Sequence, residues 1–208
     1  MDSFDPIVVL ESWTQTLSIQ SLFPSSPDEH RPLAVDIGCG KGRYLVAVAQ
    51  KHPEMNFLGI DRMESRMLKV GRKLTRAGLH HVRLVRMEAS YAVRHLLPAH
   101  SVSLFTVFFP DPWPKRRHQR RRLFKPAFLD NLDRAMAPGG KLHIATDHRN
   151  YFESIVALFE QDARFESIPA YEPTEDERTD FELHFTEQGK PIGRASFVKA
   201  GRSTGCTA

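Results

Sequence analysis

Short apolar runs alternate with amphipathic segments along most of the chain. The apolar runs have strand length and occupy residues 33–37, 56–60, 82–87, 102–109 and 141–146, with helix-length segments between them. Alternating strands and helices are typical of α/β proteins whose parallel strands are joined by right-handed crossovers. The pattern therefore predicts a Rossmann-like, doubly wound and mostly parallel sheet.

The segment 64–77 has the clearest helical periodicity in the chain. Its apolar residues recur on one face, namely Met63, Met67, Val70, Leu74 and Ala77. Gly78 follows, as expected at the end of a helix. Another face carries basic residues at the same spacing, namely Arg62, Arg66, Lys69, Lys73 and Arg76. From the sequence alone we interpret this second face as a solvated charged surface.

Near the carboxyl end, residues 181–185 and 192–198 can form an antiparallel hairpin around Gln188-Gly189-Lys190. With 208 residues, 41% of them hydrophobic, the chain can bury one substantial core. We predict a single domain over residues 31–200. Residues 1–30 are expected to be a partly flexible extension, and residues 201–208 a flexible tail.

A glycine-rich loop, Gly38-Cys39-Gly40-Lys41-Gly42, follows the first predicted strand. The dinucleotide-binding fingerprint G-x-G-x-x-G requires a third glycine that allows the helix to pack closely on the strand. Arg43 stands at that position, and Asp36 precedes the loop. The spacing therefore disfavours a nicotinamide cofactor, whereas flavin and S-adenosylmethionine enzymes also use a glycine-rich loop at this position.

Acidic residues lie at the ends of the first three predicted strands. S-adenosylmethionine carries an ammonium, a sulfonium, ribose hydroxyls and an adenine, but no phosphate, so its pocket needs carboxylates and backbone groups. Asp36 is suited to the ammonium, Asp61 to the ribose hydroxyls and Glu88 to the adenine amino group. A single acid at such a turn is usually a helix cap. Three at successive strand ends favour a cofactor site.

The fourth predicted strand leads into Asp111-Pro112-Trp113-Pro114, and open α/β sheets bind ligands just beyond the carboxyl ends of their strands. Because each proline fixes its own φ and restricts the residue before it, the turn is held rigid. A basic run follows, with seven Lys or Arg and no acid over residues 115–125. The whole chain carries a net charge of +4, yet without this run 22 basic residues face 25 acidic ones. Asp111 beside such local positive charge predicts a site that holds a nucleic-acid base.

Cys39 and Cys206 lie far apart and share no ligand-like spacing with the histidines, so neither a disulfide framework nor a metal site is predicted. The first residues lack the basic region of a signal peptide, and no apolar run approaches membrane-spanning length. These features predict a cytoplasmic protein that does not enter a membrane. The oligomeric state, monomer or homodimer, stays open.

Residues 109–118 read Phe-Pro-Asp-Pro-Trp-Pro-Lys-Arg-Arg-His, a long and specific motif. With residues 36–42, 59–61, 145–147 and 179–182, this motif resembles the bacterial tRNA (guanine-N7)-methyltransferase family. The resemblance covers residues 13–199. It implies the mostly parallel seven-stranded sheet of class I methyltransferases. It also implies methyl transfer from S-adenosylmethionine to N7 of guanine 46 in the variable loop of tRNA.

The resemblance also implies roles for individual residues. The cofactor would contact Asp36, Gly38, Gly40, Asp61, Glu88 and Asp111, and Asp111 would be the catalytic residue. Substrate would contact Lys115, Asp147, Thr179, Asp180, Phe181 and Glu182. The tRNA would contact Arg117, His118, Gln119, Arg120, Arg121 and Arg122. Many relatives carry Glu at the positions of Asp36 and Asp61, and Asp at that of Glu88.

Two other functions remain compatible with the residues. An Asp-Pro-Trp turn after the fourth strand also resembles the acid-or-amide turn of enzymes that methylate exocyclic amines. A non-catalytic RNA-binding module would need the acids at the strand ends to be structural. Trp113 is equally suited to stack on a base and to pack inside the protein.

Overall fold

The computed structural model describes residues 4–24 and 31–201, and it contains a seven-stranded sheet in the order β3-β2-β1-β4-β5-β7-β6. The strands are β1 (Leu33–Ile37), β2 (Asn56–Asp61), β3 (Val82–Arg86), β4 (Val102–Phe108), β5 (Met136–Thr146), β6 (Phe165–Ile168) and β7 (Gly193–Lys199). The first five are parallel, and β7 runs antiparallel to both β5 and β6. The doubly wound, mostly parallel sheet predicted from the sequence is confirmed.

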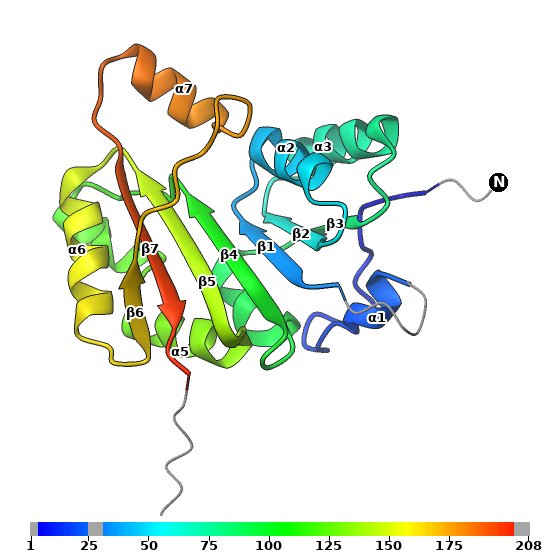
Figure 1. The fold of residues 1–208 in the computed structure, drawn as a ribbon, viewed down its shortest axis with the longest axis horizontal. Helices are drawn as coiled ribbons and strands as arrows, with labels where there is room; N and C mark the ends of the chain where they lie inside the picture. Colours follow the sequence, from blue (N-terminus) through cyan, green and yellow to red (C-terminus); the bar gives the residue numbers. More distant parts are fainter. Residues whose placement is uncertain (1–3, 25–30, 202–208) are drawn as a thin grey trace, which may run out of the picture.

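Helices cover both faces of this sheet (Figure 1). They are α1 (Ile19–Leu22), α2 (Arg43–Lys51), α3 (Glu64–Ala77), α4 (Ala89–Tyr91), the π-helical turn η1 (Ala92–Leu96), the 3₁₀ helix η2 (Arg116–Arg121), α5 (Pro126–Ala135), α6 (Arg149–Glu160) and α7 (Asp180–Glu187). Buried side chains of α2 and α3 pack on one face, and those of η1, α5 and α6 pack on the other. Helix α7 stands beyond the ends of β5 and β7 (Figure 1).

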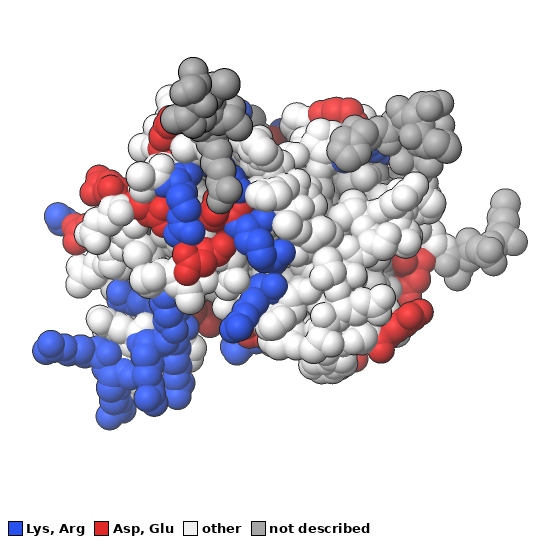
Figure 2. All heavy atoms as spheres, turned by 90° about the horizontal axis from the view of Figure 1, so that it is seen from below, with Lys and Arg blue, Asp and Glu red and all other residues white. Residues whose placement is uncertain are grey.

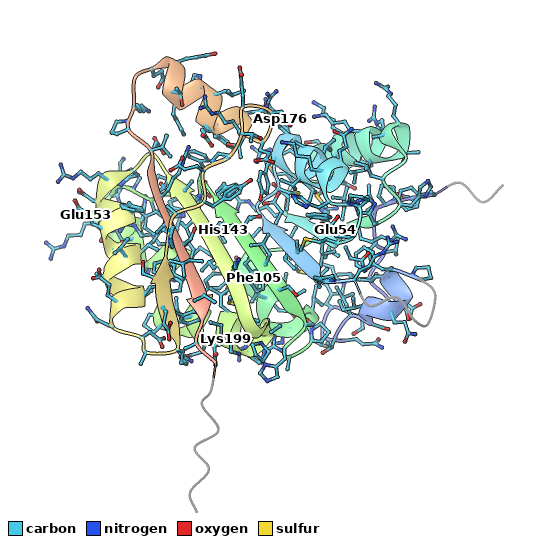
Figure 3. The ribbon with its side chains drawn as sticks, viewed as in Figure 1. Glu54, Phe105, His143, Glu153, Asp176 and Lys199 are labelled. Carbon is cyan, nitrogen blue, oxygen red and sulfur yellow. The ribbon has the colours of Figure 1, made fainter. Side chains whose placement is uncertain are left out.

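Strand alternation divides the core between the two faces. Leu33, Val35 and Ile37 of β1 belong to the cluster beneath η1, α5 and α6, whereas Ala34 belongs to the cluster beneath α2 and α3. Phe105 of β4 is fully buried near the middle of the molecule (Figure 3). Because Asp36 shares the parity of Ala34, its side chain lies on the face covered by α2.

The predicted hairpin is wrong in one of its two segments. Residues 181–185 belong to helix α7, and β7 pairs instead with β5 and with β6, a strand that the sequence did not reveal. Thr179 caps α7, because its Oγ1 accepts a hydrogen bond of 3.0 Å from the Glu182 amide. Phe181 and Phe185, one helical turn apart on α7, both contact Phe109, with ring centroids 6.3 Å and 5.6 Å away.

The described part of the amino-terminal extension is packed against the edge of the sheet. The Val8 amide donates to the Leu84 carbonyl and the Leu84 amide to the Pro6 carbonyl, each at 2.8 Å. Phe23 is 5% exposed and joins the larger core cluster. These contacts cover part of the β3 edge, which would otherwise be open to pairing with another chain. The flexibility predicted for residues 1–3, 25–30 and 202–208 concerns positions outside the described residues.

Candidate functional site

Two adjoining cavities lie at the carboxyl ends of the parallel strands. The smaller, of about 330 Å³, lies between the glycine loop and α7, and the larger, of about 710 Å³, extends from the ends of β2 and β3 to the turn after β4. Both linings include Gly38, Arg66, Phe108 and Phe181. A ligand-sized space at this edge is the position that the fold predicts.

The three glycines of the loop do different things. All three have positive φ, of 77° at Gly38, 56° at Gly40 and 72° at Gly42, a region that disfavours other residues. A Cβ on Gly42 would lie 2.6 Å from Cγ1 of Val70, so this glycine allows the loop to pack against α3. A Cβ on Gly38 would have nothing within 4 Å, which leaves its backbone open to a ligand.

Asp36 is a buried carboxylate, 6% exposed, that lines the smaller cavity. Burial raises its pKa, the hydrogen bond from Thr106 lowers it and the charge of Asp61 raises it further, so that the pKa of Asp36 is about 7. A cation in the smaller cavity would stabilise the charged carboxylate. The position therefore fits the role in ammonium binding that the sequence predicts.

Asp61 and Glu88 both line the larger cavity, and both also organise the backbone around it. Asp61 accepts hydrogen bonds from the Gly40 amide at 3.0 Å and from the Met63 amide at 2.8 Å. Glu88 caps α4, accepting from the amides of Ser90 at 3.0 Å and Tyr91 at 2.8 Å. Each carboxylate oxygen has two lone pairs, so these contacts leave acceptor capacity for a ligand. Asp61 and Glu88 therefore both hold the local backbone in place and remain accessible from the larger cavity.

Asp111 lies at the rim of the larger cavity with an exposed side chain. Two non-glycine residues with positive φ flank it, Phe109 at 53° and Trp113 at 41°. Such backbone conformations persist only where the surroundings enforce them, and they concentrate at functional sites. The Phe109 amide donates a hydrogen bond of 2.7 Å to the Ala145 carbonyl, which holds the start of the turn to β5.

Arg122 is less exposed than the other arginines of the basic run and lines the larger cavity. Its Nε donates a hydrogen bond of 2.9 Å to the Pro112 carbonyl, and its guanidinium lies 4.6 Å from the centre of the Tyr151 ring. Its NH1 also lies 3.4 Å from Oγ of Ser154. Arg122 therefore ties the Asp111 turn to α6, and its contact with RNA stays a prediction.

The remaining basic run forms the 3₁₀ helix η2 rather than an open loop. The side chains of Arg117, Arg120 and Arg121 are exposed, and Arg121 stacks 5.0 Å from the centre of the Trp113 ring. His118 meets the same ring edge-on at 5.9 Å. Trp113 thus packs within the basic segment. Figure 2 shows Lys and Arg side chains projecting together from one corner of the molecule.

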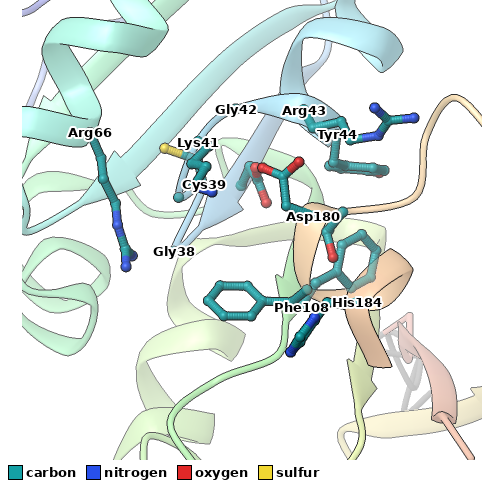
Figure 4. A pocket seen from close by; sticks show the side chains of 14 residues that line it. Gly38, Cys39, Lys41, Gly42, Arg43, Tyr44, Arg66, Phe108, Asp180 and His184 are labelled. Carbon is teal, nitrogen blue, oxygen red and sulfur yellow. The ribbon is translucent and has the colours of Figure 1, made fainter. Parts of the chain in front are cut away.

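Helix α7 closes the smaller cavity on the side opposite the glycine loop (Figure 4). Thr179, Asp180 and Phe181 line this cavity, and their contact with substrate stays a prediction. Glu182 lies elsewhere: it is 3% exposed and forms an ion pair with Arg194, with Arg178 at 3.7 Å. This ion pair links α7 to β7, because separating the two elements would leave the Glu182 carboxylate buried without its counter-ion.

Lys115 and Asp147 lie outside both cavity linings. Lys115 is exposed, and Asp147 lies 3.6 Å from Nζ of Lys190. The site also contains side chains that the sequence did not single out, namely Tyr44, Phe108 and His184. Tyr44 and Phe108 look like ordinary core residues in the sequence, and only α7 brings His184 to the cavity.

Within residues 4–24 and 31–201, no helix is long and apolar enough to cross a membrane. The same residues contain no group of three or more His, Cys, Asp or Glu arranged to hold a metal ion. Cys39 is a free, buried thiol in the glycine loop, and burial raises its pKa well above the usual value.

The fold and the cavities define a Rossmann-like protein of the methyltransferase class. The 16S rRNA methyltransferase KamB superposes with a TM-score of 0.63 over 89% of this chain and 95% of its own, at 16% identity. A family model described as "Putative methyltransferase" matches residues 30–195. At that level of sequence identity the superposition shows only the fold. The family model shows that the chain belongs to a methyltransferase family.

Curated relatives identify the family more closely. The tRNA (guanine-N(7)-)-methyltransferase of Nitrosococcus oceani is 36% identical over 80% of this chain and 71% of its own length. The enzyme of the same name from Halorhodospira halophila is 45% identical over 65% of this chain. The chain spans 59% of that relative. The chain belongs to the tRNA (guanine-N7)-methyltransferase family, as its motifs predicted.

Proposed function

We propose that this protein transfers a methyl group from S-adenosylmethionine to N7 of a guanine in tRNA. The observation that carries the proposal is the placement of Asp111. It is exposed at the rim of a 710 Å³ cavity that Asp61 and Glu88 also line, and the basic helix η2 follows it directly. One opening thus combines carboxylates for a cationic cofactor with positive charge for an RNA backbone.

The residues around the two cavities fit S-adenosylmethionine. Asp36 supplies a buried carboxylate for the ammonium, and Asp61 supplies acceptors for the ribose hydroxyls. Gly38 leaves its backbone accessible between them. When bound, the cofactor supplies an electrophilic methyl group on a sulfonium. The acids lining both cavities suit its positive charge, which a phosphate-bearing cofactor would lack.

Guanine N7 has a free lone pair, so this reaction needs alignment rather than a strong base. Asp111 is placed to accept from the N1–H and amino group of the base and to orient it. Methylation also leaves the purine ring with positive charge, which a nearby carboxylate stabilises. Because the Trp113 ring is engaged by Arg121 and His118, its main role is to hold η2 beside Asp111.

The exposed guanidinium groups of Arg117, Arg120 and Arg121 supply phosphate contacts next to the cavity. Such contacts fix the register of an RNA without reading its bases. Selection of one guanine then depends on the cavity and on tRNA shape. Phosphate contacts beside the cavity, separate from the contacts to the base inside it, favour a folded RNA over a small-molecule substrate.

The decisive experiment incubates the protein with tritiated S-adenosylmethionine and bulk tRNA that lacks the modification, followed by digestion to nucleosides. Label in 7-methylguanosine is expected. Label in a nucleoside methylated on an exocyclic amine would replace the proposal with the amine-methylating alternative. Cofactor binding by calorimetry without any transfer would overturn the tRNA substrate, and absence of cofactor binding would overturn the cofactor assignment as well.

A further inference from the structure

Helix α3 carries a second concentration of positive charge, distant in sequence from η2. Residues 62–76 include six basic side chains, namely Arg62, Arg66, Lys69, Arg72, Lys73 and Arg76, and one acid, Glu64. Glu64 pairs with Arg86 at 3.3 Å, so it neutralises none of the six directly. The charge of this helix is therefore strongly one-sided.

The fold fixes which face of α3 is available. Met67, Val70 and Leu74 are at most 1% exposed and pack on the sheet, which turns the basic side chains outward. Lys69 and Arg76 are exposed and form no ion pair or hydrogen bond with any described residue.

Like charges at i, i+3 and i, i+4 destabilise a helix, and this face contains several such pairs, among them Lys69 with Lys73 and Arg72 with Arg76. An ordinary solvated helix face mixes both signs and relieves this repulsion internally. Among the described residues only Arg66 has an acidic partner, Asp61 at 3.7 Å, and the other five basic side chains have no such relief. A bound polyanion would supply it.

The basic face of α3 continues into the functional site. Arg62 and Arg66, at the start of the helix, line the larger cavity, and Arg121 and Lys125 line the same cavity from the η2 segment. The two basic segments therefore meet at one opening from different elements of the fold. From Arg66 to Arg76 the helix advances about 15 Å, enough to follow several phosphates of a nucleic-acid backbone.

We infer that the outward face of α3 is a second phosphate-binding surface for the tRNA whose guanine enters the larger cavity. The inference rests on the proposed function, since it assigns α3 to the same RNA that η2 holds. Its continuity with the cavity favours an RNA strand over an acidic protein or an anionic membrane. Basic residues on both sides of the opening would hold the backbone across it and fix the base between them.

The test uses the full chain with Lys69→Gln and Arg76→Gln together, two substitutions remote from both cavity linings. Binding of bulk tRNA is measured against salt concentration. Two lost phosphate contacts should flatten the slope of log affinity against log salt by roughly 1.4 to 1.8. The affinity for S-adenosylmethionine should stay at the parental value.

A matched control removes the same charge elsewhere. Arg94 and Lys141 are exposed and lie outside both cavity linings, so Arg94→Gln with Lys141→Gln should leave the salt slope unchanged. Equal slopes for the α3 variant and the parent would overturn the inference while leaving the proposed function intact. A parent that neither binds nor methylates tRNA would overturn both. Loss of binding to anionic vesicles but not to tRNA would assign α3 to a membrane and overturn the inference.

Discussion

Thr106 Oγ1 donates a hydrogen bond of 2.9 Å to Oδ1 of Asp36, and the two residues are register partners on the neighbouring parallel strands β4 and β1. The bond orients a buried carboxylate toward the smaller cavity. It also lowers the pKa of Asp36, although burial outweighs it and leaves that pKa at about 7. The ionised Asp36 carboxylate is therefore unfavourable in the cofactor-free protein, at the position where the proposed cofactor would place a cation.

Asp36→Asn should stabilise the cofactor-free protein, and the gain should depend on pH. The pKa of Asp36 is about 7 in the folded state against 3.8 unfolded, so the folded state binds more protons between those values. Parental stability consequently falls as pH rises through this window. Asparagine keeps the acceptor for Thr106 without the charge. Denaturant unfolding should show a difference near zero at pH 4 that grows to at most about 4 kcal/mol above pH 7.

Asp36→Asn should weaken cofactor binding, although it should stabilise the cofactor-free protein. Calorimetry of S-adenosylmethionine binding should show parental affinity rising between pH 5.5 and 7.5, as Asp36 ionises and can pair with the ammonium. Asp36→Asn should bind more weakly and show a flat profile over that range. Parental affinity and an unchanged pH profile in the variant would remove Asp36 from the cofactor site.

Asp111→Ala should lower the single-turnover rate at saturating tRNA by about a hundredfold or more, because the reacting base loses an orienting and charged contact. Asp111→Asn separates these two contributions, since the amide keeps the shape of the side chain and one acceptor but loses the charge. Cofactor affinity should change less than the rate in both variants. A parental single-turnover rate in Asp111→Ala would contradict a role at the base.

The sequence predicted the elements whose signals are local. The helix at residues 64–77 was located to the residue, because an apolar stripe and a terminal glycine both mark it. The strands that carry Asp36 and Asp61 were located equally well, because buried parallel strands are continuous apolar runs. The sequence alone therefore places the acids at their ends along one edge of the sheet.

The sequence could not resolve features that depend on tertiary contacts. Residues 181–185 contain a Phe-rich run that suits a strand as well as a helix, and the contacts that Phe181 and Phe185 make with Phe109 are not visible in the sequence. In the sequence Arg122 is indistinguishable from its basic neighbours. Only the fold shows that its guanidinium lies over the ring of Tyr151, 29 positions away. Glu182 likewise acquires its structural role only through Arg194 on β7.

Arg122→Lys should reduce catalysis without weakening tRNA binding. Lysine keeps the positive charge but loses the planar fork that bonds the Pro112 carbonyl and stacks on Tyr151. The Asp111 turn should then shift, and a misplacement of about 1 Å can cost up to about a hundredfold in rate. Single-turnover kinetics and the salt slope of tRNA binding are both measured, and because the charge is retained, the slope should stay at its parental value while the rate falls. A parental rate would show that Arg122 does not position the turn.

Replacing Arg117, Arg120 and Arg121 with Gln should flatten the salt dependence of tRNA binding. Each lost phosphate contact should reduce the slope of log affinity against log salt by roughly 0.7 to 0.9, so the triple variant should lose about two to three units. Affinity for S-adenosylmethionine should stay near the parental value, because the cofactor has no phosphate for these guanidinium groups. Adding Arg149→Gln to the Arg94 and Lys141 control gives a variant with the same loss of charge. If the triple variant and this control keep the same slope, η2 is a solvated surface and the tRNA is held elsewhere.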